Sequence, residues 1–257
     1  MQFAANLSML FTEVELIKRF QLAKKNGFQL IEIQFPYSLS IDQLKNEINE
    51  QKLQLVLHNL PAGNWQAGDR GIACQKERQQ EFLEGLEMAI EYANALGVKK
   101  LNCLSGIQAK NSTNEKTQEI FCENLIIATK QLKPYGIELL IEPINTIDIP
   151  GFYLSKPSQA FQLVQDLNIE NLKVQYDIYH AQKSEGNIVE TIRKNIHQIG
   201  HIQFADNPGR HEPGTGELNW EFIFNKIKEL GYDQYLAAEY IPSQLTENTF
   251  NWLKDKY

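Results

Sequence analysis

Short apolar runs alternate with longer stretches of helical periodicity along the entire chain. The runs are four to seven residues long, and they lie at residues 3–6, 30–33, 53–59, 100–105, 137–142, 172–177, 201–206 and 235–240. Such alternation is typical of βα units, in which a helix returns the chain from each strand to the next parallel one. The pattern therefore predicts eight parallel strands with helices between them.

Several of the intervening segments carry recognisable helix boundaries. One begins at Thr12, whose hydroxyl can accept hydrogen bonds from the free N–H groups of a first helical turn, and ends at Gly27. Three further segments also end in glycine, at 76–97, 114–136 and 219–231. The last of these begins at Asn219, which is another capping residue. We expect helices in all four segments.

The length of the chain fits one architecture closely. Eight strands and eight helices in 257 residues give about 32 residues per unit, which matches a (β/α)8 TIM barrel of about 250 residues. A doubly wound open sheet is the alternative. Because there is no Pro/Gly/Ser-rich linker, charge block or low-complexity stretch, we expect residues 1–257 to form a single TIM-barrel domain.

Composition narrows the class of protein. With 42% hydrophobic and 22% charged residues, the chain has the composition of a soluble globular protein. Its formal net charge of -7 would repel a polyanion, so we expect no nucleic-acid partner. No run approaches the roughly 20 apolar residues that cross a bilayer, so we expect no membrane partner.

The cysteines and the N-terminal residues are typical of a cytoplasmic protein. The three cysteines, Cys74, Cys103 and Cys122, are an odd number without C-x-x-C spacing, which favours reduced thiols. The first residues lack the basic start and uninterrupted apolar stretch of a signal peptide. We expect a cytoplasmic protein and leave a homo-oligomer open.

Polar side chains end four consecutive strands of the expected barrel. They are Glu142, Asp177, Gln203 and Glu239. In a barrel the chemistry lies at the C-terminal ends of the strands, and carboxylates that converge there must be paired or bound to a cation. Four oxygen donors favour Mg²⁺ or Mn²⁺ over zinc, which would favour histidine and cysteine. Any one of these residues alone is explained as well by a local hydrogen bond, so the prediction rests on the set.

Five motifs carry a resemblance that spans nearly the whole chain. They are FAANLSMLFTEV (3–14), LVLHNLPAGNWQAGDRGIAC (55–74), IEPINTIDIPGFYL (141–154), QYDIYHAQKSEGNI (175–188) and ADNPGRHEPGTGELNW (205–220). Together they resemble the hydroxypyruvate isomerase family, a group of the xylose-isomerase-like barrels. That superfamily also includes ketose epimerases and endonuclease IV.

The resemblance implies a metal-dependent or metal-assisted isomerase with a small-molecule hydroxy-oxo acid as substrate. The reaction would interconvert hydroxypyruvate and tartronate semialdehyde, or the chain would act on a 2-oxo-tetronate. By position in the motifs, Glu142 and Glu239 correspond to the catalytic glutamate pair, and Asp177 and Gln203 to the remaining metal ligands. The related epimerases carry a histidine where Gln203 stands, so their manganese preference is not carried over.

Movement of a carbonyl between adjacent carbons requires proton removal and return through an enediolate. We expect Glu142 and Glu239 to carry the proton, because they project from different strands towards one mouth. A bound Mg²⁺ or Mn²⁺ would stabilise the developing charge. We expect the substrate's carboxylate and oxygens to be bound by donors from four residues, His58, Arg70, His180 and Arg210. Trp65 is either a lid over the mouth or a packing residue.

Three alternative functions remain at the level of sequence. A ketose 3-epimerase of the same fold would use the same paired carboxylates, so only substrate screening separates it from an isomerase. Endonuclease IV activity needs a histidine-rich site and a basic face, which five histidines and the net charge disfavour. A non-catalytic sugar-acid binding protein has no use for two buried acids.

Overall fold

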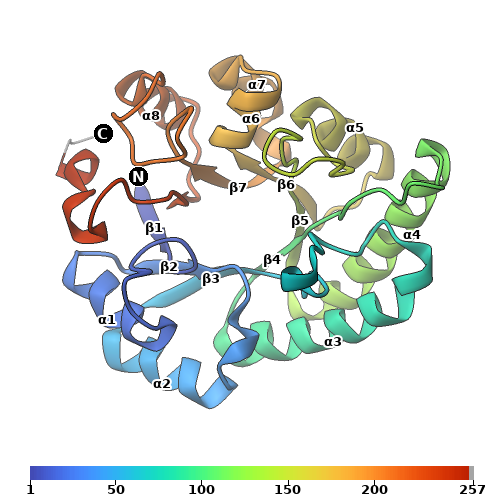
Figure 1. The fold of residues 1–257 in the computed structure, drawn as a ribbon, viewed down its shortest axis with the longest axis horizontal. Coiled ribbons are helices and arrows are strands. Elements are labelled where there is room, and N and C mark those ends of the chain that lie inside the picture. Colours follow the sequence, from blue (N-terminus) through green and yellow to red (C-terminus); the bar gives the residue numbers. More distant parts are fainter. Residues whose placement is uncertain (255–257) are drawn as a thin grey trace.

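Eight parallel strands form a closed barrel, as predicted, so the open-sheet alternative is wrong. The computed structural model describes residues 1–254, and helices surround the strands (Figure 1). Neighbours in sequence are neighbours in the barrel, and β1 pairs with β8 to close it. The strands are β1 (Gln2–Asn6), β2 (Leu30–Ile33), β3 (Gln54–Asn59), β4 (Lys100–Cys103), β5 (Glu138–Ile141), β6 (Leu172–Asp177), β7 (Ile199–Phe204) and β8 (Tyr235–Ala238).

Eight α-helices lie within the described residues, but they do not follow the strands one to one. Two of them occupy the connection between β6 and β7, and β8 is followed by 3₁₀ turns in the described part of the chain. None of the helices in this part combines the length and apolar character needed to cross a bilayer. The helices are α1 (Leu16–Lys25), α2 (Ile41–Gln51), α3 (Gln79–Leu96), α4 (Asn114–Leu132), α5 (Pro157–Leu167), α6 (Ile178–Ser184), α7 (Ile188–Asn195) and α8 (Trp220–Glu229).

Three of the four predicted helix segments are confirmed, and the start of the fourth is corrected. Asn219 caps α8 by accepting a hydrogen bond from the backbone N–H of Phe222, as expected. Thr12 does not cap a helix, because α1 begins only at Leu16. The residues before it are held elsewhere: the backbone N–H of Phe11 donates to the Thr246 hydroxyl, and Phe11 has a positive φ of 59°.

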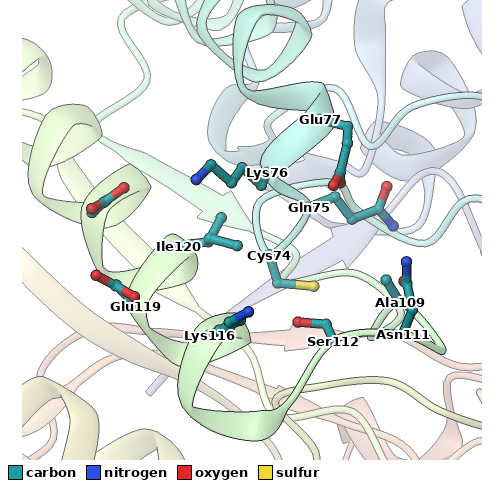
Figure 2. Close-up of a pocket in the computed structure, with 11 residues that line it drawn as sticks. Cys74, Gln75, Lys76, Glu77, Ala109, Asn111, Ser112, Lys116, Glu119 and Ile120 are labelled. Carbon is teal, nitrogen blue, oxygen red and sulfur yellow. The ribbon is translucent and has the colours of Figure 1, made fainter.

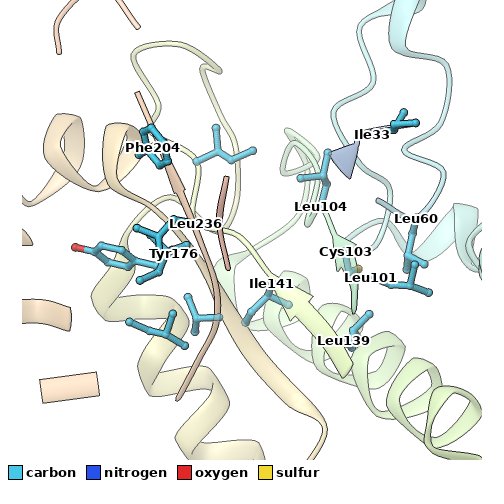
Figure 3. Packing of buried hydrophobic residues seen from close by; sticks show 14 of the residues in the cluster. Ile33, Leu60, Leu101, Cys103, Leu104, Leu139, Ile141, Tyr176, Phe204 and Leu236 are labelled. Atoms are coloured by element: carbon cyan, nitrogen blue, oxygen red, sulfur yellow. The ribbon is translucent and has the colours of Figure 1, made fainter. Parts of the chain in front are cut away.

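Side chains alternate between the two faces of each strand, and this alternation separates the core into two layers. Outward residues such as Ile141, Tyr176 and Phe204 pack with the helices in the main hydrophobic cluster (Figure 3). Inward residues such as Leu140 and Ala237, two positions before Glu142 and Glu239, form a small apolar layer inside the barrel. Inward residues nearer the strand ends are polar, and the site is built from them.

The N-terminal end of the barrel is closed by a buried lysine. Lys100 at the start of β4 donates through Nζ to the backbone carbonyl of Gly200 at 2.6 Å and to Oε1 of Gln234 at 2.9 Å. Position 200 is tightly packed, because an added Cβ would lie 2.6 Å from Cδ2 of Leu140 and 2.9 Å from Cβ of Lys173, so a larger residue would require these side chains to move. The barrel is therefore filled at this end, and only the opposite end is available for chemistry.

Candidate active site

Three buried acids lie where β5, β6 and β8 end, on the inner face of the barrel. Glu142 directly follows β5, Asp177 is the last residue of β6 and Glu239 directly follows β8. They are 1–4% exposed, and we call them the carboxylate cluster. The strands bring them together because every second residue points inward, so each acid continues the inward row of its strand. These three of the four expected ligands therefore share the mouth of the barrel.

The two carboxylate oxygens of Asp177 have different roles: one caps a helix, and the other faces the site. Its Oδ1 accepts from the backbone N–H of Tyr179 at 2.8 Å and so caps α6. Its Oδ2 is buried without a hydrogen-bond partner. One atom each of Glu142, Asp177 and His180 lie within 4.8 Å of one another, a spacing that suits a metal ion. An unsatisfied carboxylate oxygen at such a spacing fits a divalent cation, because a cation would offset the cost of its burial.

Arg210 supplies the positive charge beside the carboxylate cluster. Its Nη2 lies 2.7 Å from Oε2 of Glu239 and 3.5 Å from Oδ2 of Asp177. The guanidinium also lies over the Tyr179 ring, at 5.0 Å from the ring centroid. Arg210 is thus brought to the site as predicted, but in this structure its charge pairs with the acids of the chain itself.

Burial and mutual repulsion shift the protonation of the carboxylate cluster. Burial raises the pKa of Glu239 to about 8, against the opposing charge of Arg210. Burial raises the pKa of Asp177 to about 6. Burial, followed by the charges of Glu239 and Asp177, holds the pKa of Glu142 well above its ordinary value. Groups that exchange protons near neutral pH are the ones that acid–base catalysis needs.

Three amide side chains hold Glu239 in place, and of these the sequence analysis singled out only Gln203. Its Oε1 accepts from Nδ2 of Asn6 at 2.8 Å, from Nε2 of Gln34 at 2.9 Å and from Nε2 of Gln203 at 3.1 Å. Asn6 and Gln203 also donate to the same oxygen of the buried Glu32, at 2.7 and 2.6 Å. Asn6 and Glu32 were missed, and the signal that could have found them is a polar residue within an otherwise apolar strand.

Gln203 lies at the centre of a hydrogen-bonded path between the two glutamates. Its Oε1 accepts from Nε2 of Gln175 at 2.7 Å, and the same Nε2 donates to Oε2 of Glu142 at 3.0 Å. Asn102 donates to that Glu142 oxygen at 2.7 Å. The carbonyl oxygen expected to bind a metal therefore accepts an amide hydrogen here, and Gln203 acts as a link between Glu142 and Glu239.

His58 is not among the groups at the mouth. It pairs in register with Leu101 and Ile33, whose side chains lie in the layer between strands and helices. Its Nδ1 lies 3.2 Å from the Tyr37 hydroxyl, and the two rings meet edge to face. Burial lowers the pKa of His58 to about 4, which keeps the ring neutral.

Arg70 and Trp65 lie together in the loop between β3 and α3. The guanidinium of Arg70 stacks over the Trp65 ring at 4.2 Å and donates to the backbone carbonyls of Trp65 and Asp69. The Trp65 side chain is 40% exposed and also touches Phe35. These contacts tie Arg70 to its own loop rather than to the carboxylate cluster.

The loop that carries Arg210 is held by two buried acids, Asp206 and Glu212. Glu212 accepts from the backbone N–H and the hydroxyl of Ser243. The two oxygens of Asp206 accept from four backbone N–H groups of the same loop, at 2.8 to 3.2 Å. The backbone of Arg210 has a positive φ of 57°, so the loop needs these anchors to hold it. The PGTGE stretch lies within this loop, as a turn before α8.

A separate cavity lies between the loops that follow β3 and β4 (Figure 2). It has a volume of about 320 Å³, and its lining includes Lys76 and Glu77 from one side and Lys116 and Glu119 of α4 from the other. None of the residues predicted for the site lines it. Cys74 is in its wall, and burial raises the pKa of that thiol to about 12, which makes it an inert packing residue.

Comparison with known proteins agrees with this architecture. The chain matches the xylose isomerase-like TIM barrel family over residues 20–256. It is 46% identical to hydroxypyruvate isomerase of Escherichia coli (strain K12), over 98% of each chain. It is 36% identical to 2-oxo-tetronate isomerase of Cupriavidus necator, over 98% of this chain and 97% of that protein. The crystal structure of AP endonuclease, family 2, from Brucella melitensis superimposes with a TM-score of 0.96 at 38% identity, covering 99% of this chain and 98% of that one.

A closed parallel barrel with buried acids at the ends of its strands is the architecture of a barrel enzyme. Together with these comparisons it defines the class, which is that of the isomerases. The chain belongs to the hydroxypyruvate isomerase family of the xylose isomerase-like TIM barrels. The resemblance inferred from the sequence motifs is therefore confirmed.

Proposed function

We propose that the protein isomerises a small hydroxy-oxo acid by moving a carbonyl between adjacent carbons. The substrate pair is hydroxypyruvate and tartronate semialdehyde, with a 2-oxo-tetronate as the alternative that the second relative suggests. The observation that carries the proposal is the pair of buried glutamates at the ends of β5 and β8, both with raised pKa values.

The proposed reaction needs one proton to leave a carbon and one to reach its neighbour. A glutamate removes a proton from C3 of hydroxypyruvate, the electrons of that C–H bond form the C2–C3 double bond, and the π electrons of the C2 carbonyl move onto its oxygen to give an enediolate. Return of a proton to C2, with transfer of the C3 hydroxyl proton to the C2 oxygen, gives the aldehyde at C3 and the hydroxyl at C2 of tartronate semialdehyde. Glu142 and Glu239 suit the two transfers because both have raised pKa values, and a raised pKa makes a carboxylate a stronger base for accepting and then returning a proton.

The chain's remaining polar groups bind and orient the substrate. His180 faces Asp177 at 3.5 Å from within the mouth, and Arg210 provides the cation that a substrate carboxylate requires. The amides of Asn6, Gln34 and Gln203 fix the position of Glu239 while it exchanges its proton.

The residues present also fit a divalent cation. Glu142 and the unpartnered Oδ2 of Asp177 would hold it, and Mg²⁺ or Mn²⁺ suits oxygen donors. Such an ion supplies Lewis-acid stabilisation of negative charge on the substrate oxygens when it is bound.

The test is an assay of hydroxypyruvate, 2-oxo-tetronates and ketohexoses with variants of both glutamates. Glu142→Gln and Glu239→Gln should each lower kcat by about 10²–10⁴-fold, because each removes a proton carrier without changing its shape. Glu138→Gln, on the same strand as Glu142, is the matched control and should retain activity. Turnover in D₂O should place deuterium on the new C–H carbon. Full turnover by Glu142→Gln, or ketohexoses as the preferred substrates, would contradict the proposal.

A further inference from the structure

A buried asparagine lies directly behind His180. Asn145 follows β5 in the same loop as Glu142 and is 1% exposed. Its Nδ2 lies 2.7 Å from Nδ1 of His180, which is on the first turn of α6 and is 2% exposed. The two residues therefore form a buried pair that joins the β5 loop to α6.

The orientation of the Asn145 amide is fixed by its other contacts. Its Oδ1 accepts from the backbone N–H of Ile147 at 3.1 Å and from that of Asp148 at 2.9 Å. Its Nδ2 also donates to Oδ2 of Asp148 at 3.2 Å. A flipped amide would direct N–H groups at two backbone N–H donors and an oxygen at a carboxylate, so only one orientation satisfies all partners.

The amide orientation determines the tautomer of His180. An amide nitrogen can only donate, so Nδ1 of His180 must accept and carries no hydrogen. The single hydrogen of the neutral ring is then on Nε2. That nitrogen faces the carboxylate cluster, at 3.5 Å from Oδ2 of Asp177.

A ring nitrogen that carries hydrogen cannot ligate a metal, because ligation uses the lone pair that the hydrogen occupies. His180 belongs to the group of three residues whose spacing suits a cation, yet in this tautomer it offers a hydrogen rather than a lone pair. An N–H at the mouth of the barrel is suited to an oxygen that becomes negative during reaction.

We propose that Asn145 is a positioning residue that holds His180 in its Nε2–H tautomer, so that His180 donates a hydrogen bond to a substrate oxygen and does not ligate the metal. The proposal deepens the isomerase function and rests on it for the identity of that oxygen. The tautomer itself follows from the contacts of Asn145 alone.

The direct test is ¹⁵N NMR of the histidine side chains in the intact protein without substrate. His180 is assigned by the loss of its signals in His180→Gln. The expected spectrum has a pyrrole-type Nε2 and a pyridine-type Nδ1 for His180, and addition of Mg²⁺ should leave that pattern unchanged. A pyridine-type Nε2, either before or after Mg²⁺ is added, would overturn the proposal.

Asn145→Asp provides the matched perturbation, because a carboxylate of the same shape accepts a hydrogen from Nδ1. The tautomer should then reverse. The variant should lose about 10²-fold in kcat, as when one donor to a developing oxyanion is removed. It should also bind Mn²⁺ more tightly, because the bare Nε2 becomes a third ligand. Gln182→Glu adds the same charge two residues along α6 from His180 and should change neither the tautomer nor kcat.

The two proposals fail in different ways. If no substrate of the panel is isomerised but the tautomer is as expected, the function is wrong and the role of Asn145 in setting the tautomer stands. If isomerisation is observed and Asn145→Asp keeps both the wild-type tautomer and kcat, the positioning role is wrong and the function stands. A reversed tautomer with unchanged kcat would overturn donation to the substrate.

Discussion

Glu239 is hydrogen-bonded through both of its carboxylate oxygens. Its Oε1 accepts three amide hydrogens, while its Oε2 is paired with Arg210 at 2.7 Å. The guanidinium also lies 3.5 Å from Oδ2 of Asp177, which is the oxygen best placed for a cation. Arg210 and a metal ion therefore compete for the same negative charge.

Removal of Arg210 should strengthen metal binding. We expect Arg210→Met to bind Mn²⁺ about tenfold more tightly than the wild type, because about 1.4 kcal/mol of competing attraction is lost. Isothermal titration calorimetry with Mn²⁺ measures the change. Arg193→Met, on the exposed face of α7, serves as the control and should leave the dissociation constant as it was. Weaker binding by Arg210→Met would show that Arg210 supports the ion instead of competing with it.

At the scale of elements, the segment after β8 packs against the barrel where the eighth helix of a regular (β/α)8 barrel would lie. In the described part of the chain β8 is followed by 3₁₀ turns, and Trp252 in the last of them packs edge to face on Phe3 and Phe204 at 5.2 and 5.1 Å. Phe224 of α8 completes this aromatic cluster. The Trp252 ring thus covers the outward side chains of β1 and β7, at a place where a helix packs in a regular barrel.

This cluster predicts a large effect of one substitution. Trp252→Ala should destabilise the fold by about 3–5 kcal/mol, because a side chain that is 3% exposed leaves a cavity against two strands. Chemical denaturation followed by circular dichroism gives the free energy of unfolding. Phe222→Ala, at a position that is 50% exposed on α8, should change it by less than about 1 kcal/mol. Equal losses in the two variants would refute the packing role of Trp252.

The sequence predicted elements better than it predicted contacts. Strand positions and the inward acids follow from the spacing of apolar residues, so Glu142, Asp177 and Glu239 were placed correctly at the strand ends. His58 was misplaced because a strand end alone does not say which face a residue occupies, and a register shift lies between β2 and β3. Asn145 was missed because its partner is 35 residues away and only the folded loop brings them together.

At the scale of the whole molecule, the buried acids of the site make the free energy of unfolding depend on pH. The pKa values of Glu239 and Asp177 are raised by burial to about 8 and about 6, and that of Glu142 is raised well above its ordinary value. The folded state therefore holds protons more tightly than the unfolded chain. The resulting stabilisation is complete below about pH 4 and is lost as the pH rises towards 8.

The expected consequence is a fall in melting temperature with rising pH. For protein treated with a chelator, Tm should be roughly 5 °C lower at pH 8.5 than at pH 6.5, which corresponds to about 2 kcal/mol for a chain of this size. His180 is neutral across this range, because burial holds its pKa well below 6.5. Differential scanning calorimetry checks the trend, and Glu239→Gln should reduce it. A Tm that rises over this interval would show that the acids are not buried as described.

Because Asp206 anchors the loop between β7 and α8 through its backbone, exposed side chains of that loop can be varied in directed evolution. Four backbone N–H groups converge on this carboxylate, and the side chains of Asn207 and Glu212 tie the loop to Tyr179 and Ser243, so these residues must be kept. Gly216 must be kept, because any Cβ there would collide with the carbonyl of Asn207. Randomising the exposed Thr215 and Glu217 in a library would diversify the surface of this loop while the contacts of Asp206 are kept.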